Sequence, residues 1–470
     1  MQRRSQITIF LLVTIGLLMK LLQIGVNELA HDEPFTVLQA HRTIAGLFKI
    51  LPEENNPPLH FILMHFWVKL VPLDEGWLRL PSAIFSALIV WPLFRIGERL
   101  AGYHTALMAS LLFFFSTYHI GFAHEVRAYS LFALLATTSI WQLIRVSEGR
   151  SILWLSVINV LMIYTHFFGW LMIGIQFLCV LLLKEWRKDL RSMVKVIAIA
   201  LIAYLPYFYI FILRLNTSVG EGTWLYPPSI EEPYNMIWRW SNAPIVAAIL
   251  IVVIAIHLIR SRMRDLLTRL ATIWTFVPLI GMFLISFMVP IYLDRYLIYA
   301  SPGFFLLSAI SLHSLLPLQR WIFLPESLVI LLMLFTFQLR NTAWPRPSEV
   351  VRSAEALKQK NNADVLIHPW WYAHTYAWHL DREIFKDPDR LIGALNERSI
   401  IPIHELTAIT EHLDRKSPVI AVVAGAEEGR QFNEFQAREP FTTHMIEPDR
   451  NVRVDVLTPA APHLPSSSAE

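Results

Sequence analysis

The stretch that decides the fold is "ITIFLLVTIGLLMKLLQIGVNELAHDEPFT", residues 7–36. Its first part, about 20 residues long, carries a single charge and is long enough to cross a hydrocarbon layer as a helix. Three ionisable side chains, His31, Asp32 and Glu33, follow it directly. Such groups at a membrane boundary are costly and usually pair or line a functional cavity. The stretch therefore predicts a membrane protein with a polar site at the end of its first helix.

The composition extends this prediction to the whole chain. Of the 470 residues, 55% are hydrophobic and 16% are charged, and the mean hydropathy is +0.46, which indicates a polytopic α-helical membrane protein surrounded by membrane lipids. The net charge of +3 is small and the basic residues are spread along the chain, so no nucleic-acid partner is expected. Cys179 is the only cysteine, which excludes a disulfide framework.

The direction of the first helix fixes the rest of the topology. The basic start of the chain, with Arg3 and Arg4, predicts a cytoplasmic N-terminus and places residues 27–36 outside. The next apolar segment, 57–71, has only about 15 residues between its flanking prolines, too few to span about 30 Å. If it did span, Arg95 would lie outside, against the positive-inside tendency. We therefore expect an interfacial amphipathic helix here.

With a cytoplasmic N-terminus and a non-spanning segment 57–71, the later apolar runs predict about 11 transmembrane helices in total and a C-terminus outside. The expected helices cover about 7–27, 79–98, 103–122, 128–145, 152–165, 167–184, 192–213, 244–259, 268–290, 296–316 and 321–339. The long aromatic and Pro-rich segment 214–243 is expected to be a lid or acceptor-binding loop.

From about residue 341 the composition becomes that of a soluble α/β segment. A helix is expected in "SEVVRSAEALKQK", and strands in "ADVLIH", "PVIAVVAG" and "VRVDVLTP". The expected domains are 1–340, the membrane domain, and 341–470, a small extracytoplasmic α/β domain with a disordered tail, "PHLPSSSAE". No internal repeat is evident, so an inverted-repeat transporter gains no support.

The topology places five polar segments near the outer boundary. They are "HDE" (31–33), "EENN" (53–56), "HEVRAY" (124–129), "YTH" (164–166) and "DRY" (294–296). In glycosyl transfer from a lipid phosphate, one carboxylate base and a cationic clamp would suffice. A divalent cation is a second use of such groups, with His31, Asp32, Glu125 and His166 as candidate ligands, although no close metal-binding spacing links them. Ion-coupled transport is a third, but it predicts acids nearer the middle of the membrane.

Each of these residues also has a purely structural interpretation. Asp32 is the best candidate for the base, yet it could instead cap the following helix, which has Pro34 near its first turn. Glu125 and Arg127 could form a boundary ion pair, or serve as a second acid and a phosphate contact. Arg295 could pair with its neighbour Asp294, or clamp two phosphate oxygens with its fork of donors. His166 could be a packed or capping residue.

These same segments carry a family resemblance. "HDEPFT", "NNPPLHFILMHFW", "WLRLPSAIFSALIVWPLFRIGERLAG", "FAHEVRAYSLFAL", "YTHFFGWL" and "DRYLIYASPGFFLL" occur in the order seen in bacterial membrane glycosyltransferases of the protein O-mannosyltransferase and aminoarabinose transferase superfamily. The resemblance covers about residues 1–310 and implies the GT-C fold, with interfacial helices in the first outer loop.

The resemblance also implies roles for individual residues. The catalytic base of the family maps onto Asp32, with Glu33 beside it. A second outer-loop acid maps onto Glu125, and an Arg-Tyr pair maps onto Arg295 and Tyr296. Many relatives carry a His or Lys where this chain has Asn55 and Asn56. The cation expected near the donor phosphate is therefore missing there, which leaves Arg127, Arg295 or a metal ion to replace it.

The sequence thus predicts a glycosyltransferase in the bacterial inner membrane, with its site and C-terminal domain facing outside. It is expected to move one sugar, with inversion, from a polyprenyl-phosphate-linked donor to a lipid, glycan or protein acceptor. The alternatives are an oligosaccharide ligase and, from another class, a lipid or glycan transporter or flippase. Asp32 and Glu33 are the expected catalytic residues, and the remaining site residues form two groups. The donor phosphate and its surroundings are assigned to Glu125, Arg127, His166, Arg295 and Tyr296, and the acceptor side to Asn56, His60 and Trp224.

Overall fold

The computed structural model describes most of the chain. The described residues are 2–54, 56–220, 225–314, 324–338, 344–413, 418–438, 441–449 and 451–459. They form two compact units, each made of separate stretches of sequence. Unit 1 contains residues 1–24, 44–63 and 76–341, and unit 2 contains 25–43, 64–75 and 342–470. The predicted domains, 1–340 and 341–470, differ from these units because two parts of the first loop belong with the C-terminal segment.

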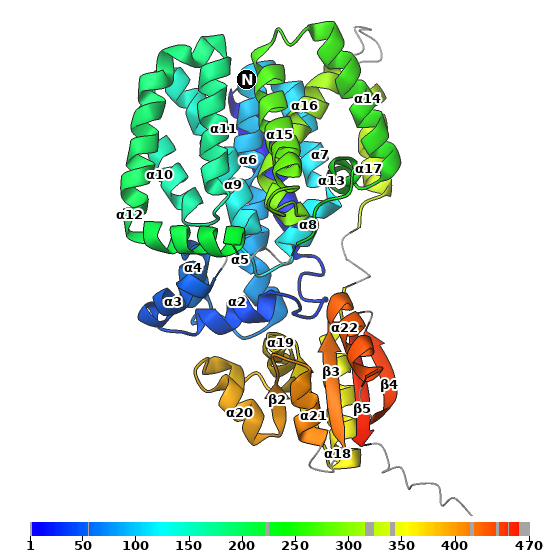
Figure 1. The fold of residues 1–470 in the computed structure, drawn as a ribbon. Coiled ribbons are helices and arrows are strands. Elements are labelled where there is room, and N and C mark those ends of the chain that lie inside the picture. The colour runs from blue at the N-terminus through cyan, green and yellow to red at the C-terminus, as the bar shows by residue number, and fades with distance from the viewer. Residues whose placement is uncertain are drawn as a thin grey trace, which may run out of the picture. The chain divides into compact units, whose positions relative to one another are not determined.

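Unit 1 is a bundle of helices (Figure 1). A helix lies in each of the predicted transmembrane segments. Their bounds are α1 Gln2–Leu21, α5 Glu75–Leu88, α6 Val90–Ala101, α7 Tyr103–Phe114, α8 Thr117–Ala123, α9 Tyr129–Ser147, α10 Leu153–Ile163, α11 Gly169–Leu182, α12 Leu190–Gly220, α14 Pro244–Ser261, α15 Leu266–Ile285, α16 Ser301–Ser314 and α17 Leu324–Phe335. The short helices η1 (Leu51–Glu53), η2 (Lys184–Asp189) and η3 (Asp294–Ala300) connect them.

Not every one of these helices is long enough to span a membrane alone. Among the described residues, 7 helices are long and apolar enough, or up to 8 if α7 and α8, which meet at 61°, form one broken span. The apolar helices α10 and α11 are shorter, with 11 and 14 residues. The chain is an integral membrane protein, and its expected number of about 11 transmembrane helices stays a prediction.

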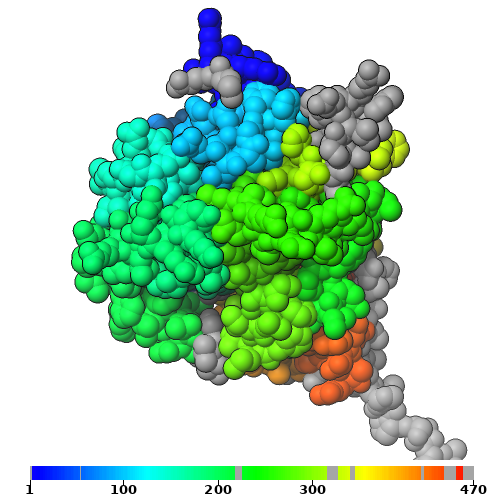
Figure 2. Space-filling view, turned by 90° about the horizontal axis from the view of Figure 1, so that it is seen from above, coloured from blue at the N-terminus to red at the C-terminus, as the bar shows by residue number. Residues whose placement is uncertain are grey.

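Close contacts between helix backbones hold the bundle together. The Cα of Gly97 on α6 faces Ala106 on α7 so closely that a Cβ at position 97 would lie 2.8 Å from the Cα of Ala106. Ile9 of α1, Phe94 of α6 and Ala106 form a buried cluster beside this contact. Figure 2 shows α1, in dark blue, at the rim of the bundle, in agreement with its 28% burial. Small residues at such crossings are typical of packed membrane helices.

The first loop contains three short helices, α2 (Glu33–Ala40), α3 (Ile44–Ile50) and α4 (Leu59–Trp67). With 9 residues, α4 is about 14 Å long and cannot cross the hydrocarbon core. This agrees with the expectation that segment 57–71 does not span.

The prediction that residues 214–243 form a loop is wrong in part. Helix α12 continues to Gly220, and residues Glu232–Ser241 form a further helix, α13. Pro233 stands in the first turn of α13, where a missing N–H costs nothing. Met236, Ile237 and Trp240 are buried on one face, so the aromatic residues that suggested a lid belong in part to an amphipathic helix.

Unit 2 contains a five-stranded sheet of order β2-β1-β3-β5-β4. Strands β1 (Asp364–His368), β2 (Ile400–Pro402) and β3 (Val419–Ala424) are parallel, and β5 (Val452–Pro459) and β4 (Phe441–Asp449) continue the sheet antiparallel. All six residues of β3 are buried, as expected for a central strand. The helices of this segment are α18 Pro347–Asn361, α19 Tyr372–Leu380, η4 Ile384–Lys386, α20 Leu391–Glu397, α21 Thr407–Leu413 and α22 Ala426–Gln436. The three predicted strands are β1, β3 and β5, and the predicted tail lies outside the described residues.

Candidate functional site

Asp32 immediately precedes helix α2, at the cap position. Its carboxylate makes no capping hydrogen bond, whereas its backbone carbonyl accepts hydrogen bonds from the amide and the hydroxyl of Thr36, both at 3.1 Å. Pro34 in the first turn stabilises the start of the helix. The alternative that the side chain of Asp32 serves as a helix cap is therefore wrong, although the residue does stand at the helix start.

Glu33 has a different environment from its neighbour. It is buried, with 1% of its surface exposed, whereas Asp32 is half-buried. One carboxylate oxygen of Glu33 accepts a hydrogen bond from the backbone amide of Ala30 at 3.4 Å. Glu33 thus folds back on the loop that carries Asp32.

A cationic cluster in unit 1 brings together two of the predicted polar segments. Arg127 lies in the bend between α8 and α9, and Arg295 lies in η3. The guanidinium carbon of each lies 5.8 Å from the centre of the Tyr129 ring. The guanidinium of Arg295 also lies 5.7 Å from the ring of Tyr296. The face of an aromatic ring attracts cations, so Tyr129 helps to hold both guanidinium groups in one region.

The carboxylate of Asp294 is engaged locally. It accepts a hydrogen bond from the backbone amide of Arg295 at 2.7 Å. The backbone carbonyl of Asp294 accepts a hydrogen bond from the hydroxyl of Tyr118 at 2.6 Å. These contacts fix the start of η3, and with it the position of Arg295.

Two buried histidines are influenced by the charges of this cluster. His166, in the turn between α10 and α11, stacks on Phe132 with ring centres 4.8 Å apart and lies 5.6 Å from the ring of Tyr296. Burial and the charges of Arg127 and Arg295 lower the pKa of His166 to about 3. Burial and the charge of Arg127 likewise lower the pKa of His60 to about 3. Both imidazoles are therefore neutral at physiological pH.

The hydrogen bonds of His166 determine its tautomer. Its Nδ1 accepts a hydrogen bond from the backbone amide of Phe168 at 3.2 Å, so the proton of the neutral ring is on Nε2. Within the part of the chain that the structure describes, neither the Nε2 of His166 nor that of His60 has a hydrogen-bond partner, although both atoms are buried. A buried donor without a partner is a group that a bound ligand can satisfy.

The structure also gives the surroundings of several other predicted residues. Asn56 and Glu125 are half-buried in bends. His31 lies in unit 2, edge-on to the ring of Trp344 at 5.4 Å. Trp224 and Asn55 lie outside the described residues. Among the residues that are described, no three His, Cys, Asp or Glu side chains are grouped so that they could hold a metal ion.

Tyr129 is the residue that sequence reasoning missed. It is 2% exposed, and the guanidinium groups of both arginines lie 5.8 Å from the centre of its ring. It belongs to the quoted motif "HEVRAY", in which only the charged residues suggested chemistry. Its position at the first residue of α9, next to the polar bend, is the signal that could have identified it.

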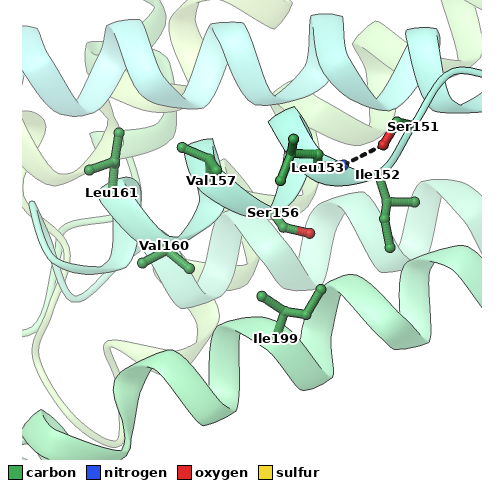
Figure 3. A pocket seen from close by; sticks show the side chains of 8 residues that line it. All are labelled: Ser151, Ile152, Leu153, Ser156, Val157, Val160, Leu161 and Ile199. Carbon is green, nitrogen blue, oxygen red and sulfur yellow. Dashed lines mark hydrogen bonds between the residues drawn. The ribbon is translucent and has the colours of Figure 1, made fainter.

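A separate pocket of about 360 Å³ lies between α10 and α12. Figure 3 shows its lining of α10 side chains, with Ile199 of α12 on the opposite side. Ser151 and Ser156 are its only polar lining residues, and the hydroxyl of Ser151 accepts a hydrogen bond from the amide of Leu153. None of the predicted site residues lines it, so we do not assign it to the candidate site.

The sequence comparison agrees with the fold. Residues 55–210 match the family described as dolichyl-phosphate-mannose-protein mannosyltransferase. This range contains His60, Glu125, Arg127 and His166. No curated protein gives a significant match to the sequence.

Solved structures match over most of the chain. Cupriavidus metallidurans ArnT, in its apo state and bound to undecaprenyl phosphate, has a TM-score of 0.61 and 14% identity, and the match covers 95% of this chain and 97% of ArnT. The Archaeoglobus fulgidus oligosaccharyltransferase in its apo form has a TM-score of 0.57 and 10% identity over 93% of this chain and 73% of its own. The same enzyme is also known in complex with an inhibitory peptide and a dolichol-phosphate.

These similarities confirm the predicted GT-C fold. Together with the family match, they identify the chain as a membrane glycosyltransferase of this fold. The transporter alternative is not favoured.

Proposed function

We propose that this glycosyltransferase moves a sugar from a polyprenyl-phosphate-linked donor to a lipid, glycan or protein acceptor on the outer side of the bacterial inner membrane. The family match and the ArnT structure bound to undecaprenyl phosphate support the donor class. The observation that carries the proposal is the cluster around Tyr129, where two guanidinium groups lie 5.8 Å from the ring and the neutral imidazole of His166 lies 6.0 Å from it. Such a set of donors suits a phosphate group.

In this proposal Arg127 and Arg295 bind the donor phosphate. The bond between the anomeric carbon and the phosphate oxygen breaks, and the two arginines stabilise the charge that develops on the leaving phosphate. The Nε2–H of His166 is the donor available for a further phosphate oxygen. The neutral state of this imidazole leaves the positive charge with the arginines.

Asp32 is the base of the proposed reaction. Its half-buried carboxylate takes the proton from the acceptor hydroxyl or amine as the acceptor attacks the anomeric carbon. Attack opposite the leaving phosphate inverts the anomeric centre. Because polyprenyl phosphate is a good leaving group, no general acid is required.

The deciding experiment substitutes Asp32→Asn in the full-length protein reconstituted into membranes. The donors are undecaprenyl-phosphate-linked pentoses and hexoses with a labelled sugar, and label transferred to envelope lipids, glycans and proteins is measured. We expect transfer to fall by at least about 10²-fold, because the amide cannot accept the proton, while undecaprenyl phosphate still binds. The matched control is Glu427→Gln, a carboxylate of unit 2 that pairs with Arg430 of its own helix, α22. Near-normal transfer by Asp32→Asn would exclude it as the base.

A further inference from the structure

The loop that carries Asp32 belongs to the same compact unit as the C-terminal segment. Residues 25–43 and 342–470 are both parts of unit 2. Hydrogen bonds join them at Glu28 and Leu29, a few residues before Asp32. These hydrogen bonds are partly buried.

Glu28 is held by the start of helix α18. One of its carboxylate oxygens accepts a hydrogen bond from the amide of Ser348 at 2.8 Å, and the other accepts one from the Ser348 hydroxyl at 2.6 Å. The indole N–H of Trp344 donates to the backbone carbonyl of Glu28 at 2.8 Å. A carboxylate at a helix N-terminus is favoured by the exposed amides and by the helix dipole.

Helix α19 contacts the backbone of the next residue, Leu29. The Nε2 of His379 lies 2.8 Å from the backbone carbonyl of Leu29, and because a carbonyl can only accept, the proton is on Nε2. The Nδ1 of His379 lies 4.0 Å from the Glu28 carboxylate. On the other side of Asp32, the ring of Phe35 packs against that of His374 at 5.4 Å.

The residue just before Asp32 is also constrained. His31 has a φ of 54°, in the left-handed region that few non-glycine residues adopt. Its ring lies edge-on to Trp344. Contacts from α18, α19 and Trp344 thus bracket Asp32 on both sides and fix an unusual backbone conformation directly before it.

Resting on the proposed function, we infer that the C-terminal segment positions the catalytic base, and that Trp344, Ser348 and His379 are its positioning residues. A base must be held within a fraction of an ångström of its productive geometry, and a displacement of about 1 Å can cost about 10²-fold in rate. None of the three residues needs to touch the substrate for this effect.

The test uses three full-length variants: Trp344→Phe, Ser348→Ala and His379→Phe. Each removes a side-chain donor to Glu28 or Leu29. We expect kcat for sugar transfer to fall at least about tenfold in Trp344→Phe and His379→Phe, with the KM for the polyprenyl-phosphate donor within about twofold of the parent value. The kcat of Ser348→Ala should fall less, because the backbone amide at position 348 still donates to Glu28. Ser348→Thr keeps the hydroxyl, so its kcat should equal that of the parent protein.

The matched control is Tyr376→Phe. Tyr376 lies on the same helix as His379, and its hydroxyl donates to Glu355 of α18 at 2.8 Å, so the hydrogen bond that the variant removes joins α19 to α18 and not to the loop. An equal loss of kcat in Tyr376→Phe would indicate general loosening and would overturn the inference. Unchanged kcat in Trp344→Phe and His379→Phe, with Asp32→Asn inactive, would overturn it while leaving the proposed function intact. If Asp32→Asn is itself active, the proposed function fails instead.

Discussion

The Nδ1 atom of His166 accepts a hydrogen bond from the backbone amide of Phe168 at 3.2 Å. This contact, two residues along the chain, puts the ring proton on Nε2 and turns a buried histidine into a fixed hydrogen-bond donor. The ring is held in place by stacking on Phe132. The two arginines whose charges lower its pKa are those assigned to the donor phosphate. The position of this donor is thus set before any ligand binds.

The first prediction concerns this donor. His166→Phe removes the Nε2–H but keeps a flat ring on Phe132, and we expect the affinity for undecaprenyl phosphate to fall about 10-fold, or about 1.4 kcal/mol. His166→Gln retains an amide N–H and should lose less. Isothermal titration of the detergent-solubilised variants with undecaprenyl phosphate measures this difference. Equal affinities for the parent and the Phe variant would show that the Nε2–H does not contact the phosphate.

The second prediction concerns the two guanidinium groups at Tyr129. Arg127→Gln and Arg295→Gln should each weaken undecaprenyl phosphate binding at least about 10-fold, because a charge-assisted hydrogen bond contributes about 1.5–3 kcal/mol. Arg295→Lys keeps the charge but loses the fork of donors, so its affinity should be intermediate.

The control for these variants is Arg99→Gln, which removes an exposed arginine that pairs with Glu148. Its affinity for undecaprenyl phosphate should equal that of the parent protein. If both Arg127→Gln and Arg295→Gln bind as tightly as Arg99→Gln, the cluster is not the phosphate site.

The third prediction is a pH dependence of stability. The pKa values of His60 and His166 are lowered to about 3 in the folded protein, against about 6.5 in an unfolded chain. Between these values the unfolded state binds more protons, so the free energy of unfolding falls as the pH drops below about 6.5. From pH 7 to pH 5 each histidine accounts for a loss of up to about 2 kcal/mol.

Thermal unfolding in detergent at pH 7 and pH 5, without ligand, tests this pH dependence. The acid-induced drop in Tm should be smaller in His166→Gln than in the parent protein. His404→Gln, at an exposed position, should leave the drop unchanged. The same drop in His166→Gln as in the parent would contradict the assignment of His166 as a buried neutral group.

Much of this architecture could be predicted from local patterns. The apolar runs located a helix in each segment that was expected to cross the membrane, because a helix in lipid must satisfy its own backbone hydrogen bonds. The short distance between Pro57 and Pro72 identified α4 as too short to span. The β-branched run "VIAVV" identified the central strand β3. Each of these features depends on residues close together in sequence.

The parts that could not be predicted depend on long-range contacts. Nothing near Glu28 indicates that Trp344 and Ser348 would contact it from more than 300 residues away. Tyr129 belongs to the candidate site because Arg127 and Arg295, from different segments, both lie near its ring. The carboxylate of Asp32 could have capped α2, and only the side-chain geometry shows that it does not.

The fourth prediction tests the close packing of α6 on α7. In Gly97→Ala the new Cβ would lie 2.8 Å from the Cα of Ala106, so the helices must separate, and we expect a loss of about 1–3 kcal/mol. Gly174→Ala is the matched control, because a Cβ there meets nothing within 4 Å. Thermal unfolding of both variants in the same detergent should show a lower Tm for Gly97→Ala alone. A Tm equal to that of the control would mean that α6 and α7 are not in close contact.

The last prediction concerns the orientation of the chain in the membrane. In a Cys179→Ala background, single cysteines are placed at Leu70, just after α4, and at Lys188, in η2; both positions are exposed. If α4 lies in the interface and the N-terminus is cytoplasmic, an impermeant maleimide added to intact spheroplasts should label position 70 and not position 188. Both cysteines should react after the membrane is permeabilised. Protection of position 70 until permeabilisation would mean that the segment before α5 faces the cytoplasm, and the proposal that Arg127 binds the donor phosphate on the outer side would then fail.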